Sequence, residues 1–369
     1  MINFILISAL LCSAGIVMYF LPRLLYISLK IKIFDRVDNR KIHSTSASRL
    51  GGASFLPAIA VTSFLTCIIS DYFNLTDSFQ LTNDSLLIIC LAVIIYCVGI
   101  YDDIVGMRYP EKFFFQFLVA TIAVLLGGYI TNFNGLFGVE RVSTFVGIPF
   151  TIFLIVFITN AINLIDGIDG LSSMLSIMAF ALYGVMFYLE RDYVDSMLCF
   201  ASLGALAPFW HHNVFGVRRG ISSKIFMGDG GALVIGFILS IMAIKLWNSS
   251  ALVGEQYNYI SDYSWIAAFT MLIIPCFDVL RVMLHRIKEH QPLFLPDKHH
   301  FHHKIMALGF TPRASLVILL IINVVFFTLN LVLATRHIGI TTIVFLDVVL
   351  WLIIHITLSH KIKKLYNIK

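Results

Sequence analysis

Long apolar runs separated by short polar connections dominate this chain. A membrane-crossing helix needs about 20 predominantly apolar residues, and by that criterion the pattern predicts about eleven spans. They cover residues 2–21, 51–70, 85–101, 112–129, 148–165, 170–189, 195–211, 230–247, 264–283, 315–334 and 338–357. The pattern therefore predicts an all-α polytopic membrane protein, with residues 1–369 forming one integral membrane domain.

The composition agrees with a membrane protein. The chain is 59% hydrophobic and 13% charged, whereas soluble domains contain about a quarter charged residues. The six cysteines all fall in predicted spans and form no Cys-x-x-Cys pair. Small core residues are therefore favoured over a disulfide or a zinc site. The N-terminus lacks a basic segment and a small-residue cleavage site, so we expect residues 2–21 to be a retained span, not a signal peptide.

Lysine and arginine fall mostly on one side of the predicted spans. Of the 26 such residues, all but Arg141, Arg191, Lys245 and Arg336 follow an odd-numbered span or lie in the C-terminal tail. Basic loops remain cytoplasmic, so we expect a periplasmic N-terminus and a cytoplasmic C-terminus. The cytoplasmic loops then cover about 22–50, 102–111, 163–169, 212–229 and 284–314. The net charge of +5 follows from this topology, and no nucleic-acid partner is expected.

Five polar clusters interrupt the apolar pattern, and all five fall on the predicted cytoplasmic side. They are DRVDNRKIHSTSASRLGG at 35–52, the pair Asp102-Asp103, NLIDGIDG at 163–170, KIFMGDGG at 224–231 and HHFHH at 299–303. Polar residues with a purely structural role would have no reason to prefer one side. The clusters therefore predict an active site on the cytoplasmic face.

The carboxylates in these clusters predict a metal site. Asp102 and Asp103 are adjacent, Asp166 and Asp169 share one face of a helical turn, and Asp229 lies between glycines. Converging carboxylates repel one another unless a cation neutralises them. Oxygen ligands suit Mg²⁺ or Mn²⁺ better than zinc. Any single aspartate could equally cap a helix or pair with a loop arginine, so the prediction depends on the whole set.

The glycines and histidines point to phosphate. Residues 228–231 (GDGG) open a span, where free backbone N–H groups suit an anion. Glycine pairs are also common where membrane helices pack, and the chain has no P-loop or GxGxxG motif. His300, His302 and His303 could donate to charge that develops on phosphate. A zinc site or a solvated basic loop near anionic lipid are the alternatives.

An enzyme that handles a phosphorylated substrate is therefore favoured, with an ion-coupled membrane transporter as the alternative class. Transporter acids are expected near the middle of spans. Two predicted spans, 170–189 and 315–334, contain no acid, and Asp278 and Asp347 are isolated exceptions. A scaffold would not need the clusters at all.

The motifs NAINLIDGIDGL, FMGDGG and HHFHH followed by KIMALGF, with a DD pair at a span end, resemble the polyprenyl-phosphate N-acetylhexosamine-1-phosphate transferases. The resemblance extends from RKIHSTSASRLGG to TPRAS. The histidine loop has the H-x-H-H form of the hexosamine branch, whereas the muropeptide branch has three consecutive histidines. Two positions depart from the family pattern: Ala232 stands where a serine often follows, and IVG follows the acid pair in place of another acid.

The resemblance implies a reaction in the bacterial inner membrane. UDP-GlcNAc and undecaprenyl phosphate would give GlcNAc-diphosphoundecaprenol and UMP with Mg²⁺, or Mn²⁺ as a substitute. This would be the first membrane step of a cell-surface glycan such as O-antigen, common antigen, a teichoic-acid linkage or capsule. Another UDP-N-acetylhexosamine or UDP-MurNAc-pentapeptide stays open as donor, as do a homodimer and a covalent two-step mechanism beside the preferred direct attack.

The resemblance also implies roles for individual residues. Asp102 would lie nearest the lipid phosphate and the metal, with Asp103 beside it, and Asp229 would be a direct metal ligand. The implied catalytic residues are Asp102, Asp103, His302 and His303. The implied substrate-binding residues are Lys41, Arg49, Asn163, Asp166, Asp169, Asn213, Phe226 and His300. Of these, Phe226 would stack on uracil, and Lys41 and Arg49 would contact the anionic substrates.

Overall fold

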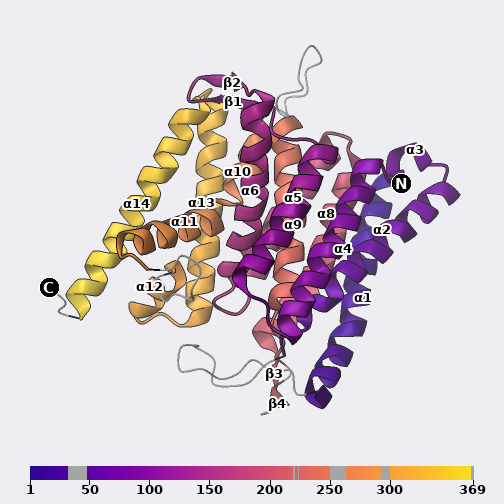
Figure 1. The fold of residues 1–369 in the computed structure, drawn as a ribbon, viewed down its shortest axis with the longest axis horizontal. Helices are drawn as coiled ribbons and strands as arrows, with labels where there is room; N and C mark the ends of the chain where they lie inside the picture. Colours follow the sequence, from indigo (N-terminus) through magenta and orange to yellow (C-terminus); the bar gives the residue numbers. More distant parts are fainter. Residues whose placement is uncertain (32–47, 219–220, 223, 250–262, 292–299, 367–369) are drawn as a thin grey trace.

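The computed structural model describes all residues except 32–47, 219–220, 223, 250–262, 292–299 and 367–369. Long helices lie side by side in a bundle (Figure 1). They are α1 (Ile2–Ile31), α2 (Phe55–Tyr72), α4 (Asn83–Ile104), α5 (Tyr109–Gly127), α6 (Thr144–Leu164), α7 (Leu171–Leu189), α8 (Tyr193–Phe215), α9 (Gly228–Ser249), α13 (Pro312–Thr335) and α14 (Ile340–Leu365). The short helices are η1 (Gly51–Ser54), α3 (Thr76–Phe79), α10 (Ser264–Thr270), α11 (Ile273–Lys288) and α12 (Phe301–Ala307).

The span prediction is confirmed at the level of about eleven membrane helices. Within the described ranges, 10 helices are long and apolar enough to cross a membrane. An eleventh results if α10 and α11, which meet at a bend of 46°, count as one broken span. The predicted first span was too short, because α1 continues to Ile31.

The all-α prediction is confirmed, and the described residues add two short hairpins to the helices. Strands β1 (Asn132–Leu136) and β2 (Val139–Arg141) pair antiparallel, as do β3 (Val217–Arg218) and β4 (Ile221–Ser222). The turn between β1 and β2 is possible because Gly135 and Gly138 adopt positive φ angles of 83° and 76°. The strands of both hairpins are too short to produce a recognisable alternation of apolar and polar residues in the sequence.

Helix α9 is the centre of the bundle. In its most apolar window 83% of the residues are buried, and it packs against α4, α6, α7 and α10. Glycines let its neighbours approach at backbone distance. A Cβ on Gly52 would lie 2.1 Å from the Cα of Gly231, and one on Gly99 would lie 2.6 Å from the Cα of Gly230. The start of α9 is therefore fixed tightly against η1 and α4.

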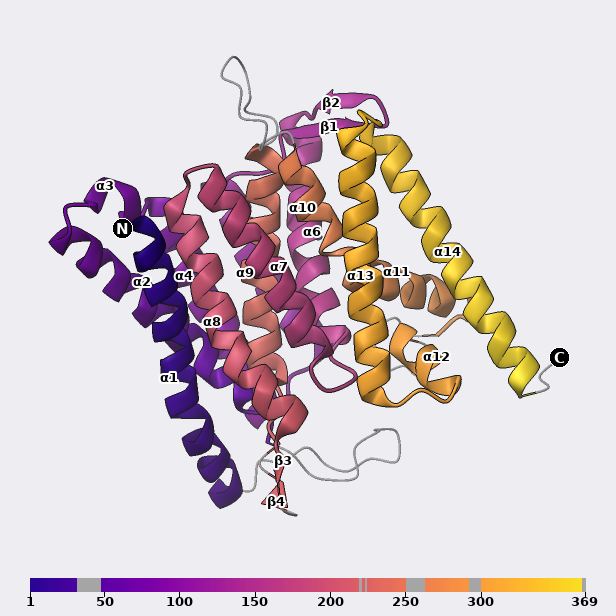
Figure 2. The ribbon, with the colours of Figure 1, turned by 180° about the vertical axis from the view of Figure 1, so that it is seen from behind.

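The described parts of the polar clusters gather at one end of the bundle, opposite the β1–β2 hairpin (Figures 1 and 2). This end contains the last turn of α4, the connection between α6 and α7, the first turn of α9, η1 and α12. Helix α11 lies across the bundle above α12 rather than along it. The assignment of this end to the cytoplasm remains a prediction.

Candidate active site

The Asp103 carboxylate holds the first turn of α9. It accepts hydrogen bonds from the backbone N–H groups of Asp229 and Gly230, both at 2.8 Å. A helix start leaves such donors unpaired and favours a negative charge. The sequence predicted phosphate for these N–H groups, but an internal aspartate uses two of them. Asp103 thus positions Asp229, and its predicted catalytic role stays a prediction.

Gly228 shows why this turn requires glycine. Its φ is +71°, and a Cβ there would lie 2.0 Å from the carbonyl oxygen of Arg49. The backbone of Phe226 also pairs with Ser48 and Gly51, whose contacts measure 2.7 and 3.0 Å. The segment before α9 is therefore joined to the segment before η1, which brings Arg49 close enough for its charge to act on Asp103.

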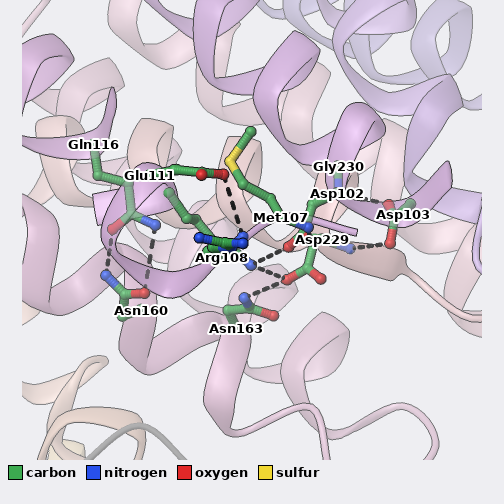
Figure 3. Close-up of polar contacts among 11 residues, drawn as sticks. Asp102, Asp103, Met107, Arg108, Glu111, Gln116, Asn160, Asn163, Asp229 and Gly230 are labelled. Carbon is green, nitrogen blue, oxygen red and sulfur yellow. Dashed lines mark hydrogen bonds and ion pairs between the residues drawn. The ribbon is translucent and has the colours of Figure 1, made fainter. Parts of the chain in front are cut away.

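A buried lysine lies between two of the predicted metal ligands. The Lys112 ammonium is 2.8 Å from Asp102 Oδ2 and 2.6 Å from Asp229 Oδ1. Asn163 Nδ2 donates to the same Asp229 oxygen at 2.6 Å (Figure 3). The other oxygen of Asp102 accepts from the Met107 backbone N–H at 2.7 Å. Side chains from α4, α5, α6 and α9 thus meet in one network.

Sequence reasoning missed Lys112, which entered only as a topological charge. It lies in the first turn of α5 and is 7% exposed. A lysine directly followed by three phenylalanines was the available signal, because a charge beside an apolar run must find a partner. One turn further along α5, Gln116 pairs its side-chain amide with that of Asn160 on α6 (Figure 3). Lys112 thus contacts α4 and α9, whereas Gln116 contacts α6.

The loop between α6 and α7 is held on its other side by the segment before α9. Asp169 forms an ion pair with Lys224, whose ammonium also lies 5.6 Å from the centre of the Phe226 ring. Asn213 accepts from Gly170 N at 2.6 Å and donates to the Ile225 carbonyl at 2.9 Å. Because both ends of the Asn213 amide bond to backbone, we assign it to holding this loop, and its predicted substrate contact remains untested.

Asp166 is the acid of this loop with the most perturbed ionisation. The Asp166 residue is partly open to solvent, but many protein atoms lie around its carboxyl group. They reduce the hydration of the carboxylate, which raises its pKa to about 7. The negative charges of Asp169 and Asp229 raise this pKa further. The loop acids and Asp229 therefore act on one another electrostatically, as expected for a shared site.

Asp278 anchors the histidine segment and was wrongly treated as an isolated exception by sequence reasoning. Its Oδ2 lies 2.8 Å from His300 Nδ1, and its Oδ1 accepts from the Phe301 backbone N–H at 2.9 Å. Arg281 contacts the same carboxylate at 3.4 Å. Asp278 is fully buried on α11. An acid inside a predicted span was the available signal, because a buried carboxylate must find a partner.

His302 joins the histidine segment to the acidic loop. A Cβ on Gly167 would lie 2.4 Å from His302 Nε2, so a larger residue there would displace the His302 ring. The His302 ring stacks on His300 at 5.7 Å with 7° between planes, and its centroid is 4.2 Å from that of His303. Burial, with the charges of His303 and His300, lowers its pKa to about 3. His302 is therefore a neutral imidazole whose ring nitrogens have no hydrogen-bond partner in the described part of the chain.

The structure thus brings together most of the predicted site. Asp102, Asp229 and Asn163 belong to one hydrogen-bonded network around Lys112. The acidic loop packs against His302 at Gly167. Lys41 and His299 lie outside the described residues.

The donor set fits a hard divalent cation. Asp102 and Asp229 each place an oxygen within 2.8 Å of the same Lys112 nitrogen, so one positive charge is already accommodated between them. The described residues contain no preformed group of three or more His, Cys, Asp or Glu ligands. Mg²⁺ requires no such group, because it binds through one or two carboxylates while water and substrate phosphates complete its shell.

Fold and site together define a polytopic membrane protein with an acidic, lysine-containing site at one end of its helix bundle. The family model of glycosyl transferase family 4 matches residues 85–247, which include Asp102, Lys112, Asp166 and Asp229. The chain is 30% identical over 323 residues to a probable undecaprenyl-phosphate N-acetylglucosaminyl 1-phosphate transferase of Bacillus subtilis (strain 168), covering 87% of this chain and 83% of that protein.

Two further relatives are named undecaprenyl-phosphate alpha-N-acetylglucosaminyl 1-phosphate transferase. That of Salmonella typhimurium is 27% identical over 79% of this chain and 74% of its own length. That of Escherichia coli (strain K12) is 25% identical over 79% and 73%. The chain therefore belongs to the polyprenyl-phosphate N-acetylhexosamine-1-phosphate transferases of glycosyl transferase family 4, and the resemblance inferred from its motifs is confirmed.

Proposed function

We propose that this protein transfers GlcNAc-1-phosphate from UDP-GlcNAc to undecaprenyl phosphate and releases UMP. The network of Asp102, Lys112, Asn163 and Asp229 carries the proposal. It combines carboxylates for a metal with a cation for phosphate, at the end of a membrane bundle where a lipid phosphate would lie. The names of the three relatives support the reaction.

Phosphoryl transfer accounts for the chemistry. An oxygen of the lipid phosphate attacks the phosphorus that carries the sugar, and the bond from that phosphorus to the UMP oxygen breaks. The sugar–phosphate bond stays intact. A phosphate monoester has a second pKa of about 6, so the acceptor is already largely ionised at pH 7 and needs no strong base. Positioning and charge neutralisation then supply most of the rate.

Direct attack fits the observed contacts better than a covalent aspartyl intermediate. Both oxygens of Asp103 accept hydrogen bonds from the start of α9. Both oxygens of Asp102 also have partners, Met107 N and Lys112. An aspartate that is already held on both oxygens is a poor nucleophile but a well-positioned ligand.

Asp229 and Asp102 would hold the divalent metal on which this family depends, with Mg²⁺ as the proposed ion and Mn²⁺ as a substitute. When bound, the metal neutralises the diphosphate and the departing UMP. The Lys112 ammonium lies between these carboxylates and would pair with phosphate once substrate is bound. His302 is a neutral imidazole, and its ring N–H can donate a hydrogen bond to a phosphate oxygen.

The remaining predicted residues would bind the donor. Asn163, Asp166 and Asp169 would hold the nucleotide and diphosphate, and Phe226 would stack on uracil. Arg49 lies close enough to Asp103 for its charge to act there, and it would attract the anionic substrates. We place this end of the bundle at the cytoplasmic face of the bacterial inner membrane, because all but four of the lysines and arginines follow odd-numbered predicted spans or lie in the C-terminal tail.

The reaction is tested with purified protein, undecaprenyl phosphate, Mg²⁺ and UDP-GlcNAc labelled in the sugar. We expect label in the lipid fraction and release of UMP in equal amounts. Asp229→Asn should abolish both, and omission of undecaprenyl phosphate is the matched control. Transport of the label into vesicles without UMP release would contradict the proposal and favour the transporter class. A panel of UDP-GlcNAc, UDP-GalNAc and UDP-MurNAc-pentapeptide tests the donor.

A further inference from the structure

One face of α14 points into the protein along three helical turns. Its residues are spaced four apart, which places them on the same face. They are Asp347, Trp351, His355 and Ser359. The first three are 0%, 4% and 4% exposed. The neighbouring positions Leu352 and Ile356 are 49% and 67% exposed, as expected for lipid contact. The inward face is thus distinct in both burial and polarity.

Asp347 ties α14 to α13 and to the break between α10 and α11. Asn330 Nδ2 on α13 lies 2.8 Å from Asp347 Oδ2 and 3.2 Å from Thr270 Oγ1. All three residues are fully buried. Thr270 is the last residue of α10, directly before the 46° bend. A buried polar group in a membrane span is costly, so this contact has a role beyond filling space.

The bend directs α11 toward the histidine segment. Helix α11 carries Asp278 across the bundle (Figure 1), where it binds His300 and the Phe301 backbone. The rest of the α14 face contacts α12 directly. The Phe301 ring lies 4.8 Å from Trp351 and 4.5 Å from His355, and Lys304 Nζ donates to Ser359 at 2.7 Å. Helix α14 therefore supports the histidine segment from both directions.

Two buried oxygens in this cluster lack a hydrogen bond. Asp347 Oδ1 and Asn330 Oδ1 have no partner among the described residues. An ionised Asp347 would leave both oxygens without a hydrogen bond, which destabilises the fold. It would also place a negative charge within the apolar bundle, which is a second, separate cost in free energy. A proton on Asp347 allows it to donate to the Asn330 amide oxygen. One proton thereby satisfies both orphan atoms and removes the charge.

We propose that Asp347 is a protonated, neutral carboxylic acid and a positioning residue: paired with Asn330, it fixes the α10–α11 break and α14 so that α12 holds His302 against Gly167. Its effect on turnover rests on the proposed transferase function. Its protonation does not, and the two are tested separately.

The protonation is tested by infrared difference spectroscopy of wild-type protein and Asp347→Asn. We expect the carbonyl band of a protonated carboxylic acid in the wild type and its loss in the variant. The absence of such a band would overturn the proposal. This measurement needs no substrate, so it remains decisive if the protein does not transfer a phosphosugar.

The positioning role is tested by two substitutions of the same residue. In Asp347→Asn the new amide can both donate to and accept from Asn330, so kcat should stay within about twofold of the wild type. Asp347→Leu removes the pair, and kcat should fall about tenfold or more while KM for UDP-GlcNAc changes much less. Thr328→Leu, an exposed position on α13, is the matched control and should behave as wild type. Equal loss in Asp347→Asn and Asp347→Leu would overturn the proposal.

A double-mutant cycle separates positioning from general destabilisation. If Asp347 acts through the histidine segment, Asp347→Leu should cost little additional activity in a His302→Ala background. A full multiplicative loss in the double variant would contradict the proposed connection. If Asp347→Leu does not yield folded protein by size-exclusion chromatography, Asn330→Leu replaces it in the same cycle.

Discussion

Lys112 on α5 and Asp229 on α9 form an ion pair of 2.6 Å in which the lysine also contacts Asp102. The pair joins the two groups that the proposed reaction requires, because Asp229 is the predicted metal ligand and Lys112 would supply a cation for phosphate. Both residues lie at helix starts, so their backbones are held by secondary structure rather than by a loop.

Replacing Lys112 with glutamine should lower kcat about a hundredfold or more, because a preorganised cation near the transferred phosphate is lost. The affinity for Mn²⁺ should not weaken, since removing the lysine leaves Asp102 and Asp229 free for the metal. Electron paramagnetic resonance of bound Mn²⁺ and steady-state kinetics measure the two effects. Lys363→Gln on the exposed end of α14 is the control, and a wild-type kcat in Lys112→Gln would contradict the assignment.

Replacing Asp103 with alanine should destabilise the protein by about 1 kcal/mol, the usual cost of a lost helix cap. Activity should fall as well, because the first turn of α9 carries Asp229. Asp103→Asn keeps one side-chain acceptor and should lie between alanine and wild type in thermal unfolding. A stable but inactive Asp103→Asn would instead show that the carboxylate takes a direct part in the reaction.

Gly167→Ala should inactivate the enzyme by pushing the His302 ring away from the acidic loop, since the new Cβ would lie 2.4 Å from His302 Nε2. We expect a loss of about a hundredfold in kcat, as is typical for a misplacement of about 1 Å at a reacting group. Gly15→Ala has nothing within 4 Å and serves as control. The same substitution in a His302→Ala protein should cost little, and a full loss there would show that Gly167 acts independently of His302.

The low pKa of His302 makes a prediction about acid stability. In the unfolded chain a histidine has its ordinary pKa of about 6.5, and in the folded protein the pKa is about 3. Between these values the unfolded state binds the extra proton, so this contribution to stability is complete above pH 6.5 and is lost as the pH falls toward 3. His302→Gln should therefore show a flatter thermal unfolding midpoint between pH 6.5 and 4 than wild type. Identical pH profiles would show that His302 is accessible to protons in the fold.

Much of this molecule is determined by local sequence. The apolar runs predict the spans, because the membrane requires a minimum helix length whatever the neighbours are. The motifs around Asp102, Asp166, Asp229 and His302 also predict which residues form the site. The structure departs from these spans in two places: α1 continues to Ile31, and the predicted span 264–283 is broken by the bend between α10 and α11.

The partnerships were decided only by the tertiary structure. From the sequence, Lys112 was only one of the basic residues that indicate orientation in the membrane. Asp103 was predicted to be catalytic, and Asp278 was an isolated acid inside a predicted span. Their observed partners lie on other helices, and which side chains meet depends on the rotation and spacing of those helices. Contacts such as Gly52 against Gly231 set that spacing, and no local periodicity encodes it. The sequence by itself determined the spans and the residue types of the site, whereas packing around α9 decided which carboxylates contact Lys112 and which one caps a helix.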